Sequence, residues 1–338
     1  MATATLRDVA KAAGVHPATV SRALNPETRS MVNAETARRV ERAAESLGYR
    51  PNPIARSLKT QRSGIIGVVV PDLTNPLFPP IVRGIDKVLD DHGYATVVVN
   101  TDSDDERERT LVDSLRSRQV EGLILATART DHPLLAEVSA QTPIVLVGRV
   151  TPGMSAWSVT NDDRAGVEAA VAHLVGQGHR RIACLAGPSS TSTGLVRLRA
   201  YRHALLDHGI TPDPELEVEC SRWSEASGAD ALRELLDRDT AATAVVAGND
   251  LIALGCYDVL RERGIVCPDD LSVVGFNDML FVDKVSPPLT TVHGAHFQAG
   301  CEAARLMLAQ LAERDLPPRQ VVLPVELVER GSTAPPRA

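Results

Sequence analysis

The chain has 338 residues, of which 43% are apolar, and a formal net charge of −7. This length favours two or three domains over a single compact core, and the apolar content excludes a disordered chain. No apolar run could span a membrane and no secretory signal is visible at the start, so we expect a cytoplasmic protein without a membrane partner. Five scattered cysteines and nine unclustered histidines predict no metal site.

The charge is unevenly distributed along the chain. Residues 1–62 contain eleven basic and five acidic side chains, a net charge of +6, whereas the remainder contains 25 basic and 38 acidic ones, a net charge of −13. A basic module can neutralise DNA phosphates, although an ordinary solvated surface would also carry such charges. The net charge therefore does not distinguish a DNA-binding module from an ordinary solvated surface, and the residue pattern must do so.

That pattern predicts three helices in the basic module. Thr5 caps the first helix, which Gly14 ends, and Pro17 begins a second helix that runs to about Leu24. A third helix begins near Asn33. The expected inward residues are Leu6, Val9, Ala10, Ala13, Val20, Leu24, Val40, Ala43, Ala44 and Leu47. Two short helices joined by a glycine turn form a helix-turn-helix.

A short basic helix should follow this module. Asn52 can cap it and Pro53 suits its first position, but about six residues are too few for a helix that is stable alone in water. We therefore expect a DNA-binding domain over residues 1–51, a hinge helix and linker over 52–64, and a larger domain over 65–334.

The larger domain alternates apolar runs with helical stretches. The runs are IIGVVVPD, ATVVVNTD, EGLILAT, PIVLVGR, RIACLAGP, TAVVAGND and LSVVGFND. Continuous apolar strands between helices indicate an α/β fold with parallel sheets covered on both faces. Many runs end in polar residues, and open α/β sheets bind ligands at the carboxyl ends of their strands.

Nothing in the sequence indicates catalysis. Glycine-rich phosphate loops, a nucleophile elbow and a zinc-binding helix are all missing from the sequence. We therefore expect no enzyme activity and no cofactor. A secreted binding protein is the other candidate, and the attached basic module and the missing signal both disfavour it.

Two stretches, LRDVAKAAGVHPATVSRALN and LGYRPNPIARSLKTQRSGIIGVVVPDLTNPLF, resemble the lactose-repressor (LacI/GalR) family. The resemblance continues through LVGQGHRRIACLAGP, VVAGND, LSVVGFND and PPLTTV, and thus covers essentially the whole chain. It implies a sequence-specific transcription regulator that binds double-stranded DNA, most often a repressor controlled by a small-molecule effector.

The family shares the two-lobed periplasmic sugar-binding fold, with the effector between the lobes. The resemblance places lobe one at about residues 65–161 and 292–323, and lobe two at about 162–291 and 324–334. The chain should therefore cross between lobes near Asn161-Asp162, Thr290-Thr291 and Leu323-Pro324.

The resemblance also assigns DNA contacts. Pro17, Ala18 and Arg22 match positions that face base edges in the major groove, where Arg22 suits guanine and Ala18 suits a thymine methyl group. His16 stands where the family usually has Ser, so a phosphate contact and a capping or surface role both stay open. The short polar residues suited to phosphates are Thr5, Thr19, Ser21 and Asn25.

In the family, the hinge helices of two subunits pair and insert a leucine into the minor groove. Leu58 matches this leucine, Ala55 is its close-packing neighbour, and Asn52 caps the same helix. An incidental leucine in a linker is the alternative. The chain ends without the leucine heptads of a tetramerising coiled coil, so we expect a homodimer on a near-palindromic operator. The expected dimer contacts include Ile81 and Val82.

Five residues match effector-binding positions of the family. Phe78 and Trp223 offer flat faces for a sugar or a purine, and Arg197 can bind ligand oxygens. Asn249 and Asn277 follow predicted strands and carry both donors and acceptors. Core packing of the aromatic residues and a surface ion pair of Arg197 stay open. Many sugar-responsive relatives have Asp where Asn277 stands. We therefore expect the effector to be a sugar or a sugar derivative, with a purine or another metabolite as the alternative. We expect the protein to be a repressor, with an activator as the alternative.

The minor-groove assignment predicts the effect of Leu58→Ala. Without the wedge, the protein should lose much of its affinity for an operator with a flexible central C–G step and little of its affinity for random DNA. Fluorescence anisotropy with both DNAs at one salt concentration measures the two affinities. Equal losses on both would show that Leu58 is not a wedge.

Overall fold

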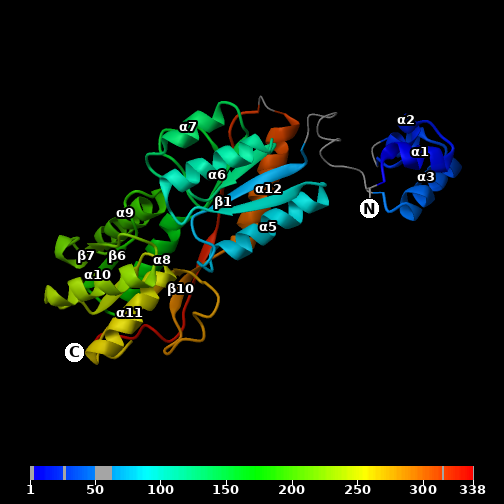
Figure 1. Cartoon of the computed structure of the whole chain (residues 1–338). Helices are drawn as coiled ribbons and strands as arrows, with labels where there is room; N and C mark the ends of the chain where they lie inside the picture. The colour runs from blue at the N-terminus through cyan, green and yellow to red at the C-terminus, as the bar shows by residue number, and fades with distance from the viewer. Residues whose placement is uncertain (1–3, 26–27, 50–62, 314–315, 338) are drawn as a thin grey trace. The chain divides into compact units, whose positions relative to one another are not determined.

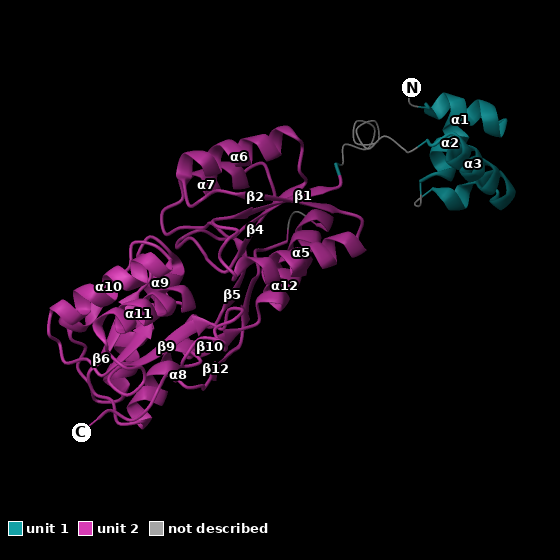
Figure 2. Cartoon of the chain, turned by 60° about the horizontal axis from the view of Figure 1, so that its bottom comes forward, with its two compact units in different colours: residues 1–63 teal, residues 64–338 magenta. Residues whose placement is uncertain are grey.

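The computed structural model describes residues 4–25, 28–49, 63–313 and 316–337. The chain divides into two compact units, residues 1–63 and 64–338 (Figure 2). The proposed hinge residues Asn52, Ala55 and Leu58 lie outside the described residues, so their assignment stays a prediction.

The first unit is a small helical domain. Its elements are α1 (Leu6–Ala13), α2 (Pro17–Ala23), a 3₁₀ turn η1 (Arg29–Met31) and α3 (Ala34–Ser46). Thr5 and Asp8 form a capping box, in which the Thr5 amide donates to Asp8 Oδ2 over 2.8 Å and the Asp8 amide donates to Thr5 Oγ1 over 3.4 Å. Gly14 ends α1 at a φ of 62°, where a side chain would be strained.

Small apolar side chains form the core of this unit. The buried residues are Val9, Ala10, Ala13, Val20, Ala23, Ala37, Val40 and Ala44. The expectation that Leu47 points inward is wrong, because it lies beyond α3 as the C-cap residue and its exposed fraction is 40%. The remaining inward residues predicted for α1 and α2 are buried or partly buried.

The second unit begins with a lobe built on one parallel sheet. Its strand order is β11-β5-β4-β3-β1-β2. The strands are β1 (Ile65–Val70), β2 (Ala95–Asn100), β3 (Gly122–Leu125), β4 (Ile144–Val147), β5 (Trp157–Asn161) and β11 (Gln320–Leu323). The helices are α5 (Phe78–Asp91), α6 (Asp105–Ser117), α7 (Pro133–Ser139) and α12 (His296–Ala312). Separate apolar cores lie on the two faces of the sheet.

The other lobe repeats this plan with the strand order β12-β10-β9-β8-β6-β7. Its strands are β6 (Ile182–Ala186), β7 (Glu217–Glu219), β8 (Ala244–Ala247), β9 (Ser272–Asn277), β10 (Thr290–Gly294) and β12 (Val325–Val328). Only the β10–β12 pair is antiparallel among the described strands of this sheet. The elements that cover the sheet or connect its strands are α8 (Asp163–Gly176), α9 (Ser192–Asp207), η2 (Pro214–Leu216), α10 (Glu225–Asp237) and α11 (Asp250–Arg263) (Figure 1).

The sheets show where the chain passes between lobes. β5 ends at Asn161 before α8 begins, and β11 and β12 are separated only by Pro324. The crossing expected near Thr290-Thr291 is wrong, because β10 pairs with β9 from Thr290 to His293 and with β12 from Thr291 to Gly294. The chain therefore leaves the second lobe after Gly294, immediately before α12.

Helices α5 and α12 pack closely because each has a glycine that faces the backbone of the other helix. A Cβ on Gly84 would clash with the carbonyl of Phe297, and a Cβ on Gly300 would clash with that of Ile81. Ile81 has an exposed fraction of only 4% and belongs to the core beneath these helices. The expected dimer contact through the Ile81 side chain is therefore wrong.

Among the described residues, no helix has both the length and the apolar character needed to cross a membrane.

Candidate functional site

Helix α2 presents most of the predicted DNA-contacting residues at the surface. His16, Ala18 and Arg22 are exposed, and Pro17, Thr19, Ser21 and Asn25 are half-buried. Within the described part of the chain, no hydrogen bond or ion pair holds the guanidinium of Arg22. This face therefore offers a free cation beside short polar groups, as a major-groove reading helix requires.

His16 caps α2 in place of the usual serine. Its Nδ1 atom accepts a hydrogen bond from the Ala18 amide over 3.2 Å. Because Nδ1 is the acceptor, the proton of the neutral ring lies on Nε2. The capping role left open by the sequence is thus present, and Nε2–H remains as an outward donor.

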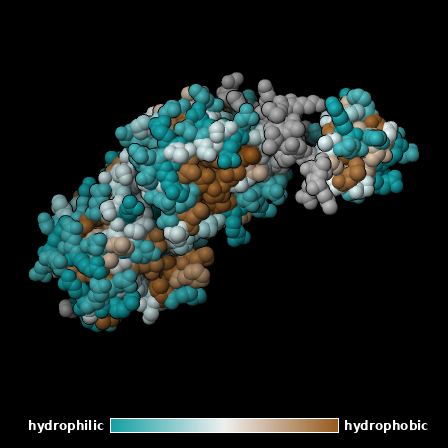
Figure 3. Space-filling view, in the orientation of Figure 1, coloured by the Kyte–Doolittle hydropathy of each residue, from teal (hydrophilic) through white to brown (hydrophobic). Residues whose placement is uncertain are grey.

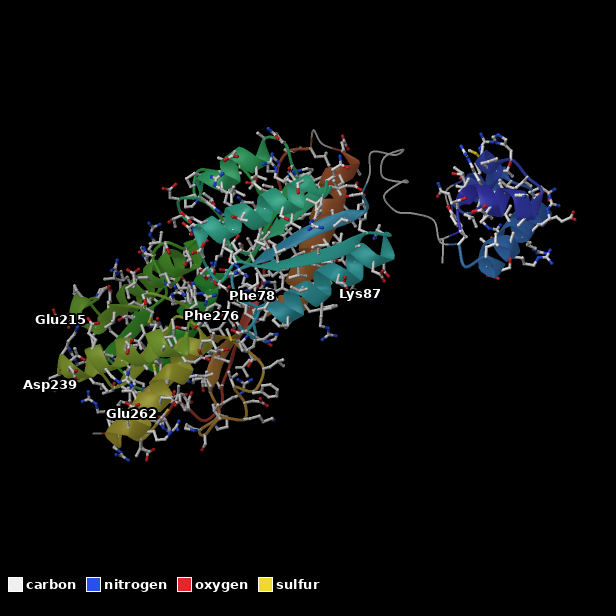
Figure 4. All side chains as sticks on the ribbon, in the orientation of Figure 1. Phe78, Lys87, Glu215, Asp239, Glu262 and Phe276 are labelled. Atoms are coloured by element: carbon white, nitrogen blue, oxygen red, sulfur yellow. The ribbon has the colours of Figure 1, made fainter. Side chains whose placement is uncertain are left out.

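The second unit contains a cleft between its two lobes. Its inner part is lined by residues of both lobes, and all five predicted effector residues lie there: Phe78, Arg197, Trp223, Asn249 and Asn277. The outer part shares Asn75, Phe78, Arg149 and Trp223 with it. Figure 4 labels Phe78 of the first lobe and Phe276 of the second in the region where the lobes meet.

Arg197 is held in place by a buried ion pair. Its Nε and Nη2 atoms donate to Asp163 Oδ1 over 2.9 and 2.7 Å, and Nη1 donates to the Gly248 carbonyl over 2.7 Å. The guanidinium carbon lies 3.5 Å from the centroid of the Phe276 ring. Burial raises the pKa of Asp163, and the charge of Arg197 opposes this shift. The surface ion pair considered as an alternative is therefore replaced by a buried one that fixes the arginine at the cleft.

Trp223 lies across two glycines. A Cβ on Gly187 would overlap the indole ring, and a Cβ on Gly248 would press against it. Trp223 Nε1 is buried and has no hydrogen-bond partner among the described residues. Phe78, at the first position of α5, is 4% exposed and contributes both to the apolar core and to the cleft wall.

The two asparagines of the cleft, Asn249 and Asn277, form different hydrogen bonds. Asn249 caps α11, and its Oδ1 accepts from the Ile252 amide over 2.9 Å, so mainly its amide donor remains for a ligand. Asn277 ends β9 at a φ of 116°, and its carbonyl accepts from His296 Nε2 over 2.7 Å. Burial lowers the pKa of His296, which keeps this ring neutral near pH 7.

Several cleft residues were not predicted from the sequence. Asn161 lines the inner cleft with a buried Oδ1 that has no partner in the described part of the chain. Arg149, two residues after the end of β4, lines both parts of the cleft. Burial above all, and then the charges of Arg197 and Arg129, lower its pKa to about 10. The tendency of predicted strands to end in polar residues was the signal for Arg149, whereas Asn161 followed none of the predicted strands.

A helix-turn-helix followed by two similar α/β lobes around a cleft defines a class, the DNA-binding transcription regulators with a periplasmic-binding-protein-like domain. Two family models match: residues 5–52 match "Bacterial regulatory proteins, lacI family", and residues 171–333 match "Periplasmic binding protein-like domain".

Full-length relatives agree with these models. The chain is 35% identical to the transcriptional repressor CytR of Escherichia coli K12 over 98% of this chain and 96% of that protein. A lac repressor dimer bound to operator and the anti-inducer ONPF matches with a TM-score of 0.88 and 32% identity over 98% of this chain and all of that one. A complex of the regulator CelR with cellobiose matches with a TM-score of 0.75 and 33% identity, covering 97% and 99% of the two chains. The protein belongs to the LacI family of bacterial regulators, and the resemblance found in the sequence is confirmed.

Removal of Arg197 should destabilise the second unit. Arg197→Met leaves Asp163 buried without a cation, which costs about 3–5 kcal/mol of unfolding free energy near neutral pH. In the variant, burial raises the pKa of Asp163 above its wild-type value, because the charge of Arg197 no longer opposes it. The loss should therefore shrink as the pH falls, because Asp163 becomes protonated and then carries no unpaired charge. Urea unfolding followed by tryptophan fluorescence reports on this unit, since Trp157 and Trp223 are the two tryptophans of the chain.

Arg202→Met on the same helix is the control. Arg202 is half-exposed in its pair with Glu217, so its removal should cost less than about 1 kcal/mol. Equal losses in the two variants would contradict a special role for the buried pair.

Proposed function

We propose that this protein is a homodimeric repressor whose affinity for a near-palindromic operator is controlled by a sugar or sugar derivative bound between the lobes. One observation carries the proposal: the five predicted effector residues surround a single cleft in a chain that also exposes a DNA-reading helix. Two unpartnered buried polar atoms at the cleft, in Trp223 and Asn161, support a ligand there, because such atoms in folded proteins usually have partners.

In the proposed DNA complex, α2 enters the major groove. Arg22 binds the O6 and N7 atoms of guanine, Ala18 packs on a thymine methyl group, and Pro17 lies beside the same bases. His16 donates from Nε2 to a phosphate. The remaining phosphate contacts come from Thr5, Thr19, Ser21 and Asn25.

The proposed effector packs a ring against Phe78 and Trp223. Asn249 donates to its hydroxyl groups, and Asn277, whose side chain has no partner among the described residues, can donate and accept. The CelR complex supports a carbohydrate, because its ligand is cellobiose. The protein then acts by binding and not by catalysis.

The proposed dimer buries apolar surface of the second unit. Figure 3 shows apolar surface over α5 and over the loop next to β10. In that loop Leu280 and Phe281 have exposed fractions of 63% and 72%. Exposed apolar patches of this kind mark interfaces, and a second copy of the chain is the partner that a two-fold operator requires.

A ligand screen with two readouts tests the function. Sugars, sugar derivatives and nucleobases are first screened for an increase in melting temperature, since a bound ligand stabilises the folded state. Each ligand that binds is then added to the protein on operator DNA. A repressor with an inducing or co-repressing ligand changes its operator affinity, whereas ligands that bind in the cleft and leave the operator affinity unchanged would contradict the proposal. Transcription in a reporter strain separates repression from activation.

The proposed base contact of Arg22 predicts a specific loss. Arg22→Ala should weaken operator binding by about 1–3 kcal/mol and relax the preference at one base pair in each half-site. Arg38→Ala removes the same charge from an exposed position on α3 and serves as the control. Binding-site selection with both variants reads out the preference, and an unchanged preference for Arg22→Ala would make Arg22 a phosphate contact.

A further inference from the structure

We propose that the effector carries an anionic oxygen group, a phosphate or a carboxylate, which Arg149 binds beside the N-terminus of α9. This inference rests on the proposed ligand-binding function and specifies the charge of the ligand. It distinguishes sugar phosphates and sugar acids from neutral sugars, nucleosides and nucleobases.

Arg149 differs from the two paired arginines of the cleft, and from Arg222 of the outer cleft, which is exposed. Arg197 is paired with Asp163, and Arg129 is paired with Asp105 and lies 3.8 Å from Glu108. Arg149 lines both the inner and the outer cleft, yet it has no hydrogen bond or ion pair with any described residue. Its guanidinium thus has no direct partner in the described part of the chain, although the charge of Glu108 acts on it favourably.

The carboxylates around the cleft are already engaged. Asp163 is held by Arg197, and Glu108 accepts a hydrogen bond from Thr127 Oγ1 over 2.5 Å. At the outer cleft Asp72 accepts from Thr74, and Asp102 accepts from Asn100. With a pKa of about 10, Arg149 stays protonated at neutral pH despite its burial and the neighbouring arginines, and an anion would relieve both penalties.

The start of α9 adds positive potential near this cation. The Val150 amide donates to Ser192 Oγ over 3.0 Å, which ties the segment of Arg149 to the first turn of α9. This turn contains no acidic residue, whereas α8 and α11 at the same cleft begin with Asp163 and Asp250. The helix dipole and the guanidinium thus both add positive potential to the cleft that they line.

The rest of the ligand lies toward the aromatic residues. Phe78 and Trp223 line both parts of the cleft, so a ring placed between them can keep an attached anionic group at Arg149. The Trp223 Nε1 donor and the Asn161 Oδ1 acceptor remain for hydroxyl groups of the ring. A phosphorylated or oxidised sugar has both parts.

The test compares matched ligands on the full-length protein. Thermal shift at constant ionic strength compares phosphate with chloride, and calorimetry compares ribose with ribose 5-phosphate and glucose with glucuronate. Phosphate should stabilise the wild type more than chloride does, and in at least one pair the anionic member should bind about tenfold or more tightly than the neutral one. The pair that shows this difference tells a phosphate from a carboxylate.

Variants localise the effect. Arg149→Met should abolish the stabilisation by phosphate and the preference within the pair, and Arg149→Lys should retain part of both. Arg222→Met removes an equal charge from an exposed position at the outer cleft and should change anion affinity less than about threefold, because exposed charges are screened. Tryptophan fluorescence and the melting temperature without ligand verify that each variant is folded.

Three results would overturn the proposal: no stabilisation of the wild type by phosphate beyond chloride, neutral ligands that bind as tightly as their anionic partners, or equal losses in Arg149→Met and Arg222→Met. If neither member of either ligand pair binds, the thermal-shift comparison of phosphate with chloride alone tests the proposal. A neutral sugar that binds and changes operator affinity would refute the anion and leave the ligand-controlled repressor intact. Anions that bind through Arg149 without changing operator affinity would support the anion site and contradict the ligand-controlled repressor.

Discussion

The ion pair between Arg197 and Asp163 is the contact on which the cleft depends. It joins α9 to the first turn of α8, and the further bond to the Gly248 carbonyl joins both to the end of β8. A buried pair contributes little net stability, but it is expensive to break, because either partner alone is a desolvated charge. It therefore fixes the position of a guanidinium that stacks on Phe276 and faces the cleft.

The cleft combines fixed and uncommitted groups. Asn249 and His296 are held by bonds to backbone atoms, whereas Arg149, the Trp223 Nε1 atom and the Asn161 Oδ1 atom lack partners among the described residues. Asn161 ends the strand after which the chain first crosses between lobes, so a ligand that binds it acts at a crossing point. A ligand held by both lobes can bias their relative arrangement only through such differential contacts, and any coupling to operator binding is reciprocal.

Sequence patterns predicted the three helices of the first unit from their helical spacing of apolar residues, and the seven buried parallel strands from their continuous apolar runs. β10 was not predicted, and a crossing between lobes was expected within it, because Thr290, Thr291 and His293 follow no apolar pattern and only pairing with β9 and β12 makes them a strand. Family resemblance brought five cleft residues together. It did not reveal Asp163 as the partner of Arg197, or Arg149 as an unpaired cation, because such contacts join distant segments and depend on side-chain geometry.

The central claim is that the second unit controls DNA binding by the first, and one comparison tests it without knowledge of the effector. The operator affinity of the isolated fragment 1–62 is measured beside that of the full chain at the same salt concentration. We predict weak binding by the fragment, which offers one half-site and no means of pairing, and tight binding by the full chain, in which the second units hold two DNA-binding modules together. If the fragment bound the operator as tightly as the full chain, control through the second unit would be contradicted.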